Sequence, residues 1–105
     1  MTALAEGTWV DVGAARDVPL MEGRSVRLAG GRVAIFRLPD GWAAVEHACP
    51  HKGGPLSDGI VGDRCVTCPL HNWRFDLDTG EQIGGGAQLR TFQVREREGR
   101  LELAT

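Results

Sequence analysis

The sequence predicts a small all-β domain, and three observations support this. Short runs of β-branched and other apolar residues recur along the 105-residue chain, and Gly or Pro interrupts them. Several of these runs alternate polar and apolar residues, which is the period of a half-buried strand. No segment combines a helical period with capping residues at both ends. We therefore expect an antiparallel β-sandwich or barrel, folded as one domain over residues 1–105.

The N-terminal half contains four expected strands joined by tight turns. Gly30 and Gly31 supply the turn of a hairpin between the second and third strands. Pro39-Asp40-Gly41 predicts the next turn, because Pro presets φ and Gly tolerates a positive φ. The expected strands are residues 8–12, 25–28, 32–38 and 42–46.

The C-terminal part returns to the alternating pattern after a different middle region. We expect strands at residues 90–95 and 100–103, with Glu98 and Gly99 as the hairpin turn between them. The middle region, about 47–77, holds all three Cys and all three His of the chain. It predicts a small, loop-built insertion on the β scaffold.

Charge and hydropathy exclude several classes of function. The net charge is −2 with mixed signs along the chain, so no basic run predicts nucleic-acid binding. No apolar stretch approaches the roughly 20 residues that span a bilayer, so we expect no membrane segment. The first residues lack a basic region followed by an apolar core, which is the pattern of a secretory signal. A cytoplasmic protein is therefore expected.

Two stretches in the middle region carry the chemistry. The first reads Cys49-Pro50-His51 and the second Cys68-Pro69-Leu70-His71, with sixteen residues between His51 and Cys68. Each stretch offers one thiolate and one imidazole. Facing stretches of this kind predict a [2Fe–2S] cluster with Cys49 and Cys68 on one iron and His51 and His71 on the other, the Rieske arrangement.

This ligand set has an electrostatic consequence. Four thiolates would leave an oxidised [2Fe–2S] core as a dianion, whereas two thiolates and two neutral imidazoles leave it uncharged. Adding an electron to a neutral site costs less than adding one to an anion. Rieske potentials accordingly span roughly −150 to +300 mV, against about −400 mV for plant-type ferredoxins.

Other interpretations of these residues remain open. A mononuclear zinc site uses the same residue types, but its usual spacing pairs Cys with Cys and His with His. Cys65 and Cys68 form a C-x2-C spacing that would suit a redox dithiol. However, residues 65–68 predict a strand, which would point these two side chains to opposite faces, so we interpret Cys65 as a small core residue. His47 is interpreted as a strand-end residue.

The spacing of Cys49, His51, Cys68 and His71 closely resembles the Rieske family. That resemblance implies antiparallel β-sheets carrying an inserted cluster-binding subdomain, with His51 and His71 nearest to solvent as the electron port. Over nearly its whole length the chain is most similar to the small subunit of assimilatory NAD(P)H nitrite reductase. The stretches that carry this similarity are residues 33–37, 49–57 and 68–77, with 79–81 and 90–92 fitting both this family and the Rieske ferredoxins of aromatic-ring dioxygenases.

The resemblance also bears on the potential. High-potential Rieske proteins carry a further Cys in each loop, joined as a disulfide, and Gly54 and Leu70 stand at those positions here. They also use Ser and Tyr hydroxyls as donors to sulfur, and the matching residues here are Trp73 and Phe75. Because neither has a hydroxyl, we expect a low-potential centre near the bottom of the Rieske range.

The expected function is single-electron transfer, because no substrate site of the chain's own is apparent. The resemblance implies a large nitrite reductase subunit with flavin, sirohaem and an iron–sulfur cluster as partner, reducing nitrite to ammonium. The alternative is a Rieske ferredoxin that serves a ring-hydroxylating dioxygenase. A redox-sensing or assembly module remains a third possibility. Lys52, beside His51, suits an acidic partner and equally suits a solvated loop.

Overall fold

The computed structural model describes residues 9–28, 31–47, 55–70 and 72–104. In these ranges the regular structure consists of strands and two short 3₁₀ turns, with no α-helix. No helix there is long and apolar enough to span a membrane. The elements are β1 (Trp9–Ala14), η1 (Ala15–Asp17), β2 (Gly23–Leu28), β3 (Gly31–Leu38), β4 (Gly41–Glu46), η2 (Leu56–Asp58), β5 (Ile60–Gly62), β6 (Cys65–Thr67), β7 (Arg74–Asp76), β8 (Thr91–Phe92), β9 (Val94–Arg97) and β10 (Arg100–Ala104).

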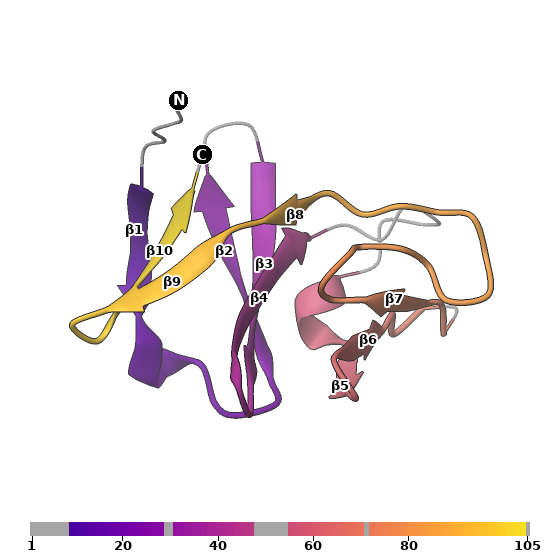
Figure 1. Ribbon diagram of the computed structural model, residues 1–105, viewed down its shortest axis with the longest axis horizontal. Helices are drawn as coiled ribbons and strands as arrows, with labels where there is room; N and C mark the ends of the chain where they lie inside the picture. The colour runs from indigo at the N-terminus through magenta and orange to yellow at the C-terminus, as the bar shows by residue number, and fades with distance from the viewer. Residues whose placement is uncertain (1–8, 29–30, 48–54, 71, 105) are drawn as a thin grey trace.

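The strands form three antiparallel sheets, and Figure 1 shows the smallest of them beside the other two. The first has the order β1-β10-β9. The second, which we call the central sheet, has the order β2-β3-β4-β8. The third, which we call the small sheet, has the order β5-β6-β7. Neighbouring strands pair antiparallel in all three, which confirms the predicted all-β antiparallel fold.

Strand β3 is buried on both faces, and this places the central sheet in the middle of the molecule. On one face Val33 and Ile35 pack in a core with Leu101 of β10. On the other face Phe36 packs in a second core with Val66 of β6. Side chains alternate along a strand, so a strand covered on both faces needs apolar residues at successive positions. This requirement accounts for the unbroken apolar run of β3.

The predicted turns join the strands as expected. Pro39 and Asp40 connect β3 with β4, and Glu98 and Gly99 connect β9 with β10. The φ angles of Glu98 and Gly99 are 52° and 79°, the left-handed values that a type I′ turn requires. The hairpin expected across Gly30 also forms, because β2 and β3 pair antiparallel, although Gly30 itself lies outside the described residues.

The single strand predicted over residues 90–95 is divided between two sheets. Strand β8 pairs with β4 of the central sheet, whereas β9 pairs with β10 of the first sheet. Gln93 lies between them, and its carbonyl oxygen accepts a hydrogen bond from the backbone amide of Ala104 over 3.0 Å. The chain changes layers here while staying extended, so the polar–apolar alternation alone does not reveal the break.

The middle region contains more regular structure than the loop-built insertion that we predicted. The strand expected at residues 65–68 is present as β6, and it pairs with β5 and β7. These two strands have no counterpart in the prediction. Each has three residues, which is too short for a period of two to be recognised in the sequence.

Candidate cluster site

One of the four predicted ligands, Cys68, lies among the described residues, whereas Cys49, His51 and His71 lie outside them. Within the described ranges no three His, Cys, Asp or Glu side chains gather as a metal site. The structure does describe the chain on either side of both predicted ligand stretches, and therefore shows how their ends are held.

The second ligand stretch is the loop of the β6–β7 hairpin. The backbone amide of Cys68 donates to the carbonyl oxygen of Trp73 over 2.7 Å, which extends the ladder beyond Thr67 and Arg74. The amide of Asn72 donates to the carbonyl oxygen of Cys68 over 3.1 Å. Asn72 has a φ of 60°, a left-handed value that Asn tolerates better than most residues. These two bonds hold the ends of the Cys68–Trp73 loop together.

Cys68 directly follows β6, lies in an apolar environment and is only 1% exposed. It belongs to the same core as Val66, two residues earlier, and Phe75 of the facing strand. Trp73 packs against this core, with its ring centroid 6.4 Å from that of Phe75. The predicted thiol ligand is thus shielded from water at the start of the β6–β7 loop.

The described residues on either side of the first ligand stretch also lie close together. The amide of Leu56 donates to the carbonyl oxygen of His47 over 3.0 Å, so the residues that flank the 48–54 segment are neighbours in space. Leu56 begins η2, is fully buried, and belongs to the same core as Cys68. One core therefore holds both Leu56, which follows the first ligand stretch, and Cys68, which begins the second.

Gly59 brings η2 directly against β6. A Cβ atom at this position would lie 2.5 Å from the carbonyl oxygen of Thr67 and 2.7 Å from Cγ2 of Val66. The contact requires a residue without a side chain. Because Thr67 precedes Cys68, Gly59 holds the two ligand stretches close together, and sequence reasoning missed this role.

Cys65 behaves as the core residue that we predicted. It is 8% exposed, and its Sγ donates to the carbonyl oxygen of Asp63 over 3.5 Å. Along β6 and its extension, side chains alternate, so Cys65 and Cys68 point to opposite faces. This geometry disfavours a redox dithiol between them.

His47 lies immediately before the first ligand stretch and has an unusual environment. Its Nδ1 is buried and has no hydrogen-bond partner among the described residues. Burial lowers the pKa of this imidazole, nearby Arg32 lowers it further, and Asp58 opposes the shift. Burial and the charge of Arg32 both favour the neutral form of this imidazole.

The described part of the site fits an iron–sulfur cluster. A thiolate in the apolar surroundings of Cys68 would be costly without a cation beside it, and ferric iron supplies that cation. Hydrogen-bond donors near the sulfur ligands also tune the reduction potential of such a cluster. The side chains of Trp73 and Phe75, next to Cys68 on this hairpin, carry no hydroxyl.

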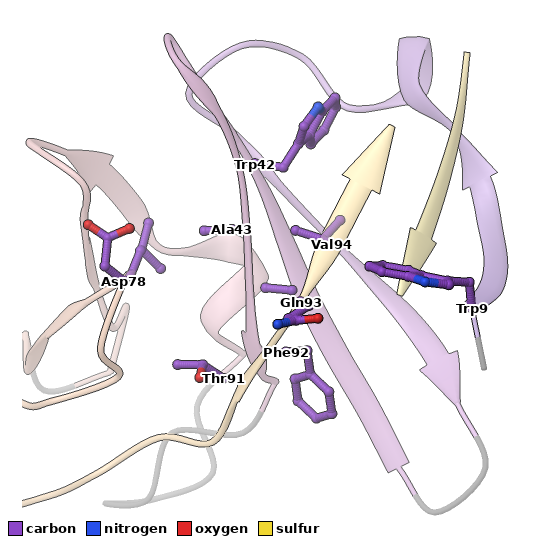
Figure 2. A pocket seen from close by; sticks show the side chains of 10 residues that line it. Trp9, Trp42, Ala43, Asp78, Thr91, Phe92, Gln93 and Val94 are labelled. Carbon is purple, nitrogen blue, oxygen red and sulfur yellow. The ribbon is translucent and has the colours of Figure 1, made fainter. Parts of the chain in front are cut away.

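A shallow hollow of about 470 Å³ lies away from this hairpin loop, between the first and central sheets. Figure 2 shows Gln93 and Val94 at its centre, with Trp42 above them, Trp9 to the right and Asp78 to the left. The described residues that line it include no His or Cys, so it does not extend the described part of the candidate cluster site.

Comparison with known protein families identifies one match. The Rieske [2Fe-2S] domain model matches residues 8–94, a range that includes all four predicted ligands. A solved structure from Mycobacterium tuberculosis, described as an NADH-dependent nitrite reductase small subunit, superposes with a TM-score of 0.87. It is 32% identical, and the alignment covers 94% of this chain and 96% of that one.

Relatives with other roles are similar to a comparable degree. The anthranilate 1,2-dioxygenase ferredoxin subunit of Burkholderia cepacia is 37% identical over 81 residues, which is 76% of this chain and 74% of that protein. A cholesterol 7-desaturase of Ciona intestinalis is 46% identical over 82 residues. That alignment covers 70% of this chain but only 17% of the desaturase, so the chain corresponds to a small part of this longer relative.

Proposed function

We propose, from the premise that this chain belongs to the Rieske [2Fe–2S] domain family, that Cys49, His51, Cys68 and His71 bind its cluster. Membership of the family means that the chain carries a Rieske-type [2Fe–2S] cluster and transfers electrons to a partner redox protein. The assignment of the four ligands is our own. It rests on their residue types and spacing and on the surroundings of Cys68.

One observation carries the ligand proposal furthest. The residues that flank both ligand stretches meet in a single core, where Leu56 and Cys68 are buried together and Gly59 contacts the carbonyl oxygen of Thr67. A four-ligand cluster shared between two stretches requires such convergence. The cluster supplies reversible one-electron chemistry, and the protein's part is to hold the ligands and keep water away from the sulfur side.

We propose further that the chain is the small subunit of an NAD(P)H-dependent nitrite reductase. It would bind a large subunit that carries flavin, sirohaem and an iron–sulfur cluster and that reduces nitrite to ammonium. The similarity to the Mycobacterium tuberculosis structure over nearly the whole of both chains supports this role. The proposed subdomain that carries the cluster is about residues 47–77.

A second candidate is a ferredoxin for an aromatic-ring-hydroxylating dioxygenase. The Burkholderia cepacia ferredoxin subunit favours this role with 37% identity over most of both chains. Both roles use the same cluster and differ in the partner. Purified chain, reduced with dithionite and mixed with a nitrite reductase large subunit or a dioxygenase oxygenase component, distinguishes them. The proposed role predicts that the large subunit, and not the oxygenase, reoxidises the cluster.

The ligand proposal is tested by spectroscopy on the purified chain and on alanine variants of each ligand. We expect a red-brown protein whose dithionite-reduced form gives the anisotropic, low-average-g EPR signal of a Rieske centre. Replacing His51 or His71 should abolish that signal, whereas replacing Cys65 should leave it unchanged. A colourless protein with one zinc and no inorganic sulfide would contradict the proposal.

A further inference from the structure

Arg64 occupies an unusual backbone position at the end of the small sheet opposite Cys68. Gly62 of β5 pairs with Cys65 of β6, so Asp63 and Arg64 form a two-residue hairpin turn. Their φ angles are 51° and 60°, both in the left-handed region. A type I′ turn of this kind favours Gly at its second position, where an Arg side chain is disfavoured. Residues held in such conformations are frequently retained for function.

The Arg64 guanidinium connects two carboxylates from different parts of the fold. Its Nε and Nη2 donate to Oδ2 and Oδ1 of Asp78 over 2.8 and 2.6 Å, which is a bidentate pair. Its Nη1 donates to Oδ1 of Asp40. The backbone carbonyl oxygen of Arg64 also accepts a bond from the amide of Leu77 over 2.9 Å. Both the side chain and the backbone carbonyl of Arg64 are therefore engaged.

These partners place Arg64 across the boundary between two sheets. Asp78 follows β7 of the small sheet, and its bidentate pair orders the guanidinium there. Asp40 lies in the β3–β4 turn of the central sheet. Figure 1 shows that turn and β5 toward the same, lower edge of the molecule. The Arg64–Asp40 pair thus links the small sheet to the central sheet.

The remaining contact between these sheets is mainly apolar. Phe36 and Leu38 of β3 pack in one core with Val66 and Phe75 of the small sheet. Apolar burial is non-directional, so it holds the sheets together without fixing their angle tightly. The charge-assisted hydrogen bonds of the Arg64 guanidinium are directional, so they restrict the angle between the two sheets more tightly than the apolar core does.

We propose that Arg64 is a positioning residue, which fixes the orientation of the small sheet relative to the central sheet through Asp40 and Asp78. Strand β6 runs from the Arg64 turn directly to Cys68, so a rotation at the turn moves the opposite, cluster-bearing end of the same strand. Arg64 then sets the direction in which that end faces a partner that also contacts the central sheet. This last consequence rests on the proposed function, whereas the orienting role does not.

The substitution R64G separates positioning from stability. Gly is favoured at the left-handed turn position, so R64G relieves backbone strain while it removes the guanidinium and its hydrogen bonds to Asp40 and Asp78. A second variant, D40A, removes only the acceptor on the central sheet and leaves the rest of this exposed turn unchanged. The matched control is R100Q, which removes a bidentate pair with Asp11 that lies within β1 and β10 of the first sheet.

The readout is backbone residual dipolar couplings of the oxidised full chain with its cluster. In the wild type we expect one alignment tensor to fit the central and small sheets together. In R64G and D40A the small sheet should need a different tensor or show a lower degree of order than the central sheet. R100Q should keep the single tensor, and R64G should keep a thermal midpoint at or above that of the wild type.

Two results would overturn the proposal. One is a single wild-type tensor in both R64G and D40A, and the other is an equal change in R100Q. If R64G fails to fold, D40A alone decides, because it leaves the Asp63–Arg64 turn intact. Absence of the Rieske EPR signal in wild-type protein would contradict the proposed function, yet the dipolar couplings would still report on Arg64.

Discussion

Gly59 packs its α-carbon so closely against the backbone of Thr67 that a Cβ atom would lie 2.5 Å from the Thr67 carbonyl oxygen. The φ of Gly59 is −73°, which any residue adopts, so only space demands glycine there. The contact joins the end of η2, which follows the first ligand stretch in the chain, to the residue before Cys68. It makes Gly59 a sensitive point for the whole candidate site.

We expect G59A to push η2 away from β6, to lower the free energy of unfolding by about 1–3 kcal/mol, and to reduce cluster content. Urea unfolding and iron and sulfide per chain measure the two effects. The control is G62A on β5, where a Cβ atom meets nothing within 4 Å. Equal cluster content and stability in both variants would show that the contact does not hold the ligand stretches.

The second prediction concerns the potential. F75Y places a hydroxyl next to Cys68 in a fully buried position. One new hydrogen bond to sulfur of about 1 kcal/mol corresponds to a rise of about 40 mV in a one-electron midpoint. Redox titration followed by EPR measures it, and the wild type should lie near the lower, roughly −150 mV, end of the Rieske range.

F36Y is the control for this change. Phe36 is fully buried in the same core but belongs to β3 of the central sheet. Its hydroxyl should destabilise the protein without raising the midpoint, because a buried hydroxyl without a partner costs about 1–3 kcal/mol. A wild-type midpoint far above the low end would contradict the interpretation of Trp73 and Phe75.

The third prediction separates the two described cysteines. C65A removes a small buried side chain that points away from the Cys68 face, so it should retain the cluster and lose about 1 kcal/mol of stability. C68A should lose the cluster altogether. Visible absorbance per chain after anaerobic purification gives the comparison. A C65A protein without colour would mean that Cys65 takes part in the site.

The fourth prediction concerns acid stability. Hydrogen bonds from Arg64, together with its charge, hold the pKa of Asp78 below its ordinary 3.8, against an opposing effect of burial. A carboxyl whose folded-state pKa is depressed stabilises the fold above its unfolded pKa, and this stabilisation is lost as the pH falls below 3.8 through the folded-state pKa. Asp78 is 52% exposed, so solvent limits the contribution to less than about 1 kcal/mol.

D78N should therefore be less stable than the wild type at neutral pH, and the difference should shrink as the solution becomes acidic. Free energies of unfolding between about pH 6 and pH 2 measure this convergence. A difference that stays constant over that interval would show that the Asp78 charge does not stabilise the fold.

Strands with a strong pattern could be predicted from the sequence. The apolar run of β3 and the turns at Pro39–Asp40 and Glu98–Gly99 each appear where their residue types favour them. Local chemistry decides such features, because strand propensity and turn geometry depend on neighbouring residues. The division of the 90–95 segment at Gln93 depends instead on which sheet offers a free edge, which no local pattern encodes.

The candidate site divides in the same way. Residue types and spacing were enough to propose Cys49, His51, Cys68 and His71, because thiolate and imidazole are the groups that this cluster binds. The contacts that hold the two stretches near each other could not be predicted, since they depend on Gly59 meeting Thr67 and on Leu56 entering the core of Cys68. Gly59, Thr67 and Leu56 carry no thiol or imidazole, so the search for cluster ligands does not find them.

The sequence by itself determined the strand class, the turns and the set of ligand candidates, because each depends on side chains close together along the chain. Only the tertiary structure decided that β3 is covered on both faces, that the extended segment around Gln93 serves two sheets, and that Arg64 reaches Asp40. Those features join residues distant in sequence. Packing and directional hydrogen bonds select them only once the sheets are assembled.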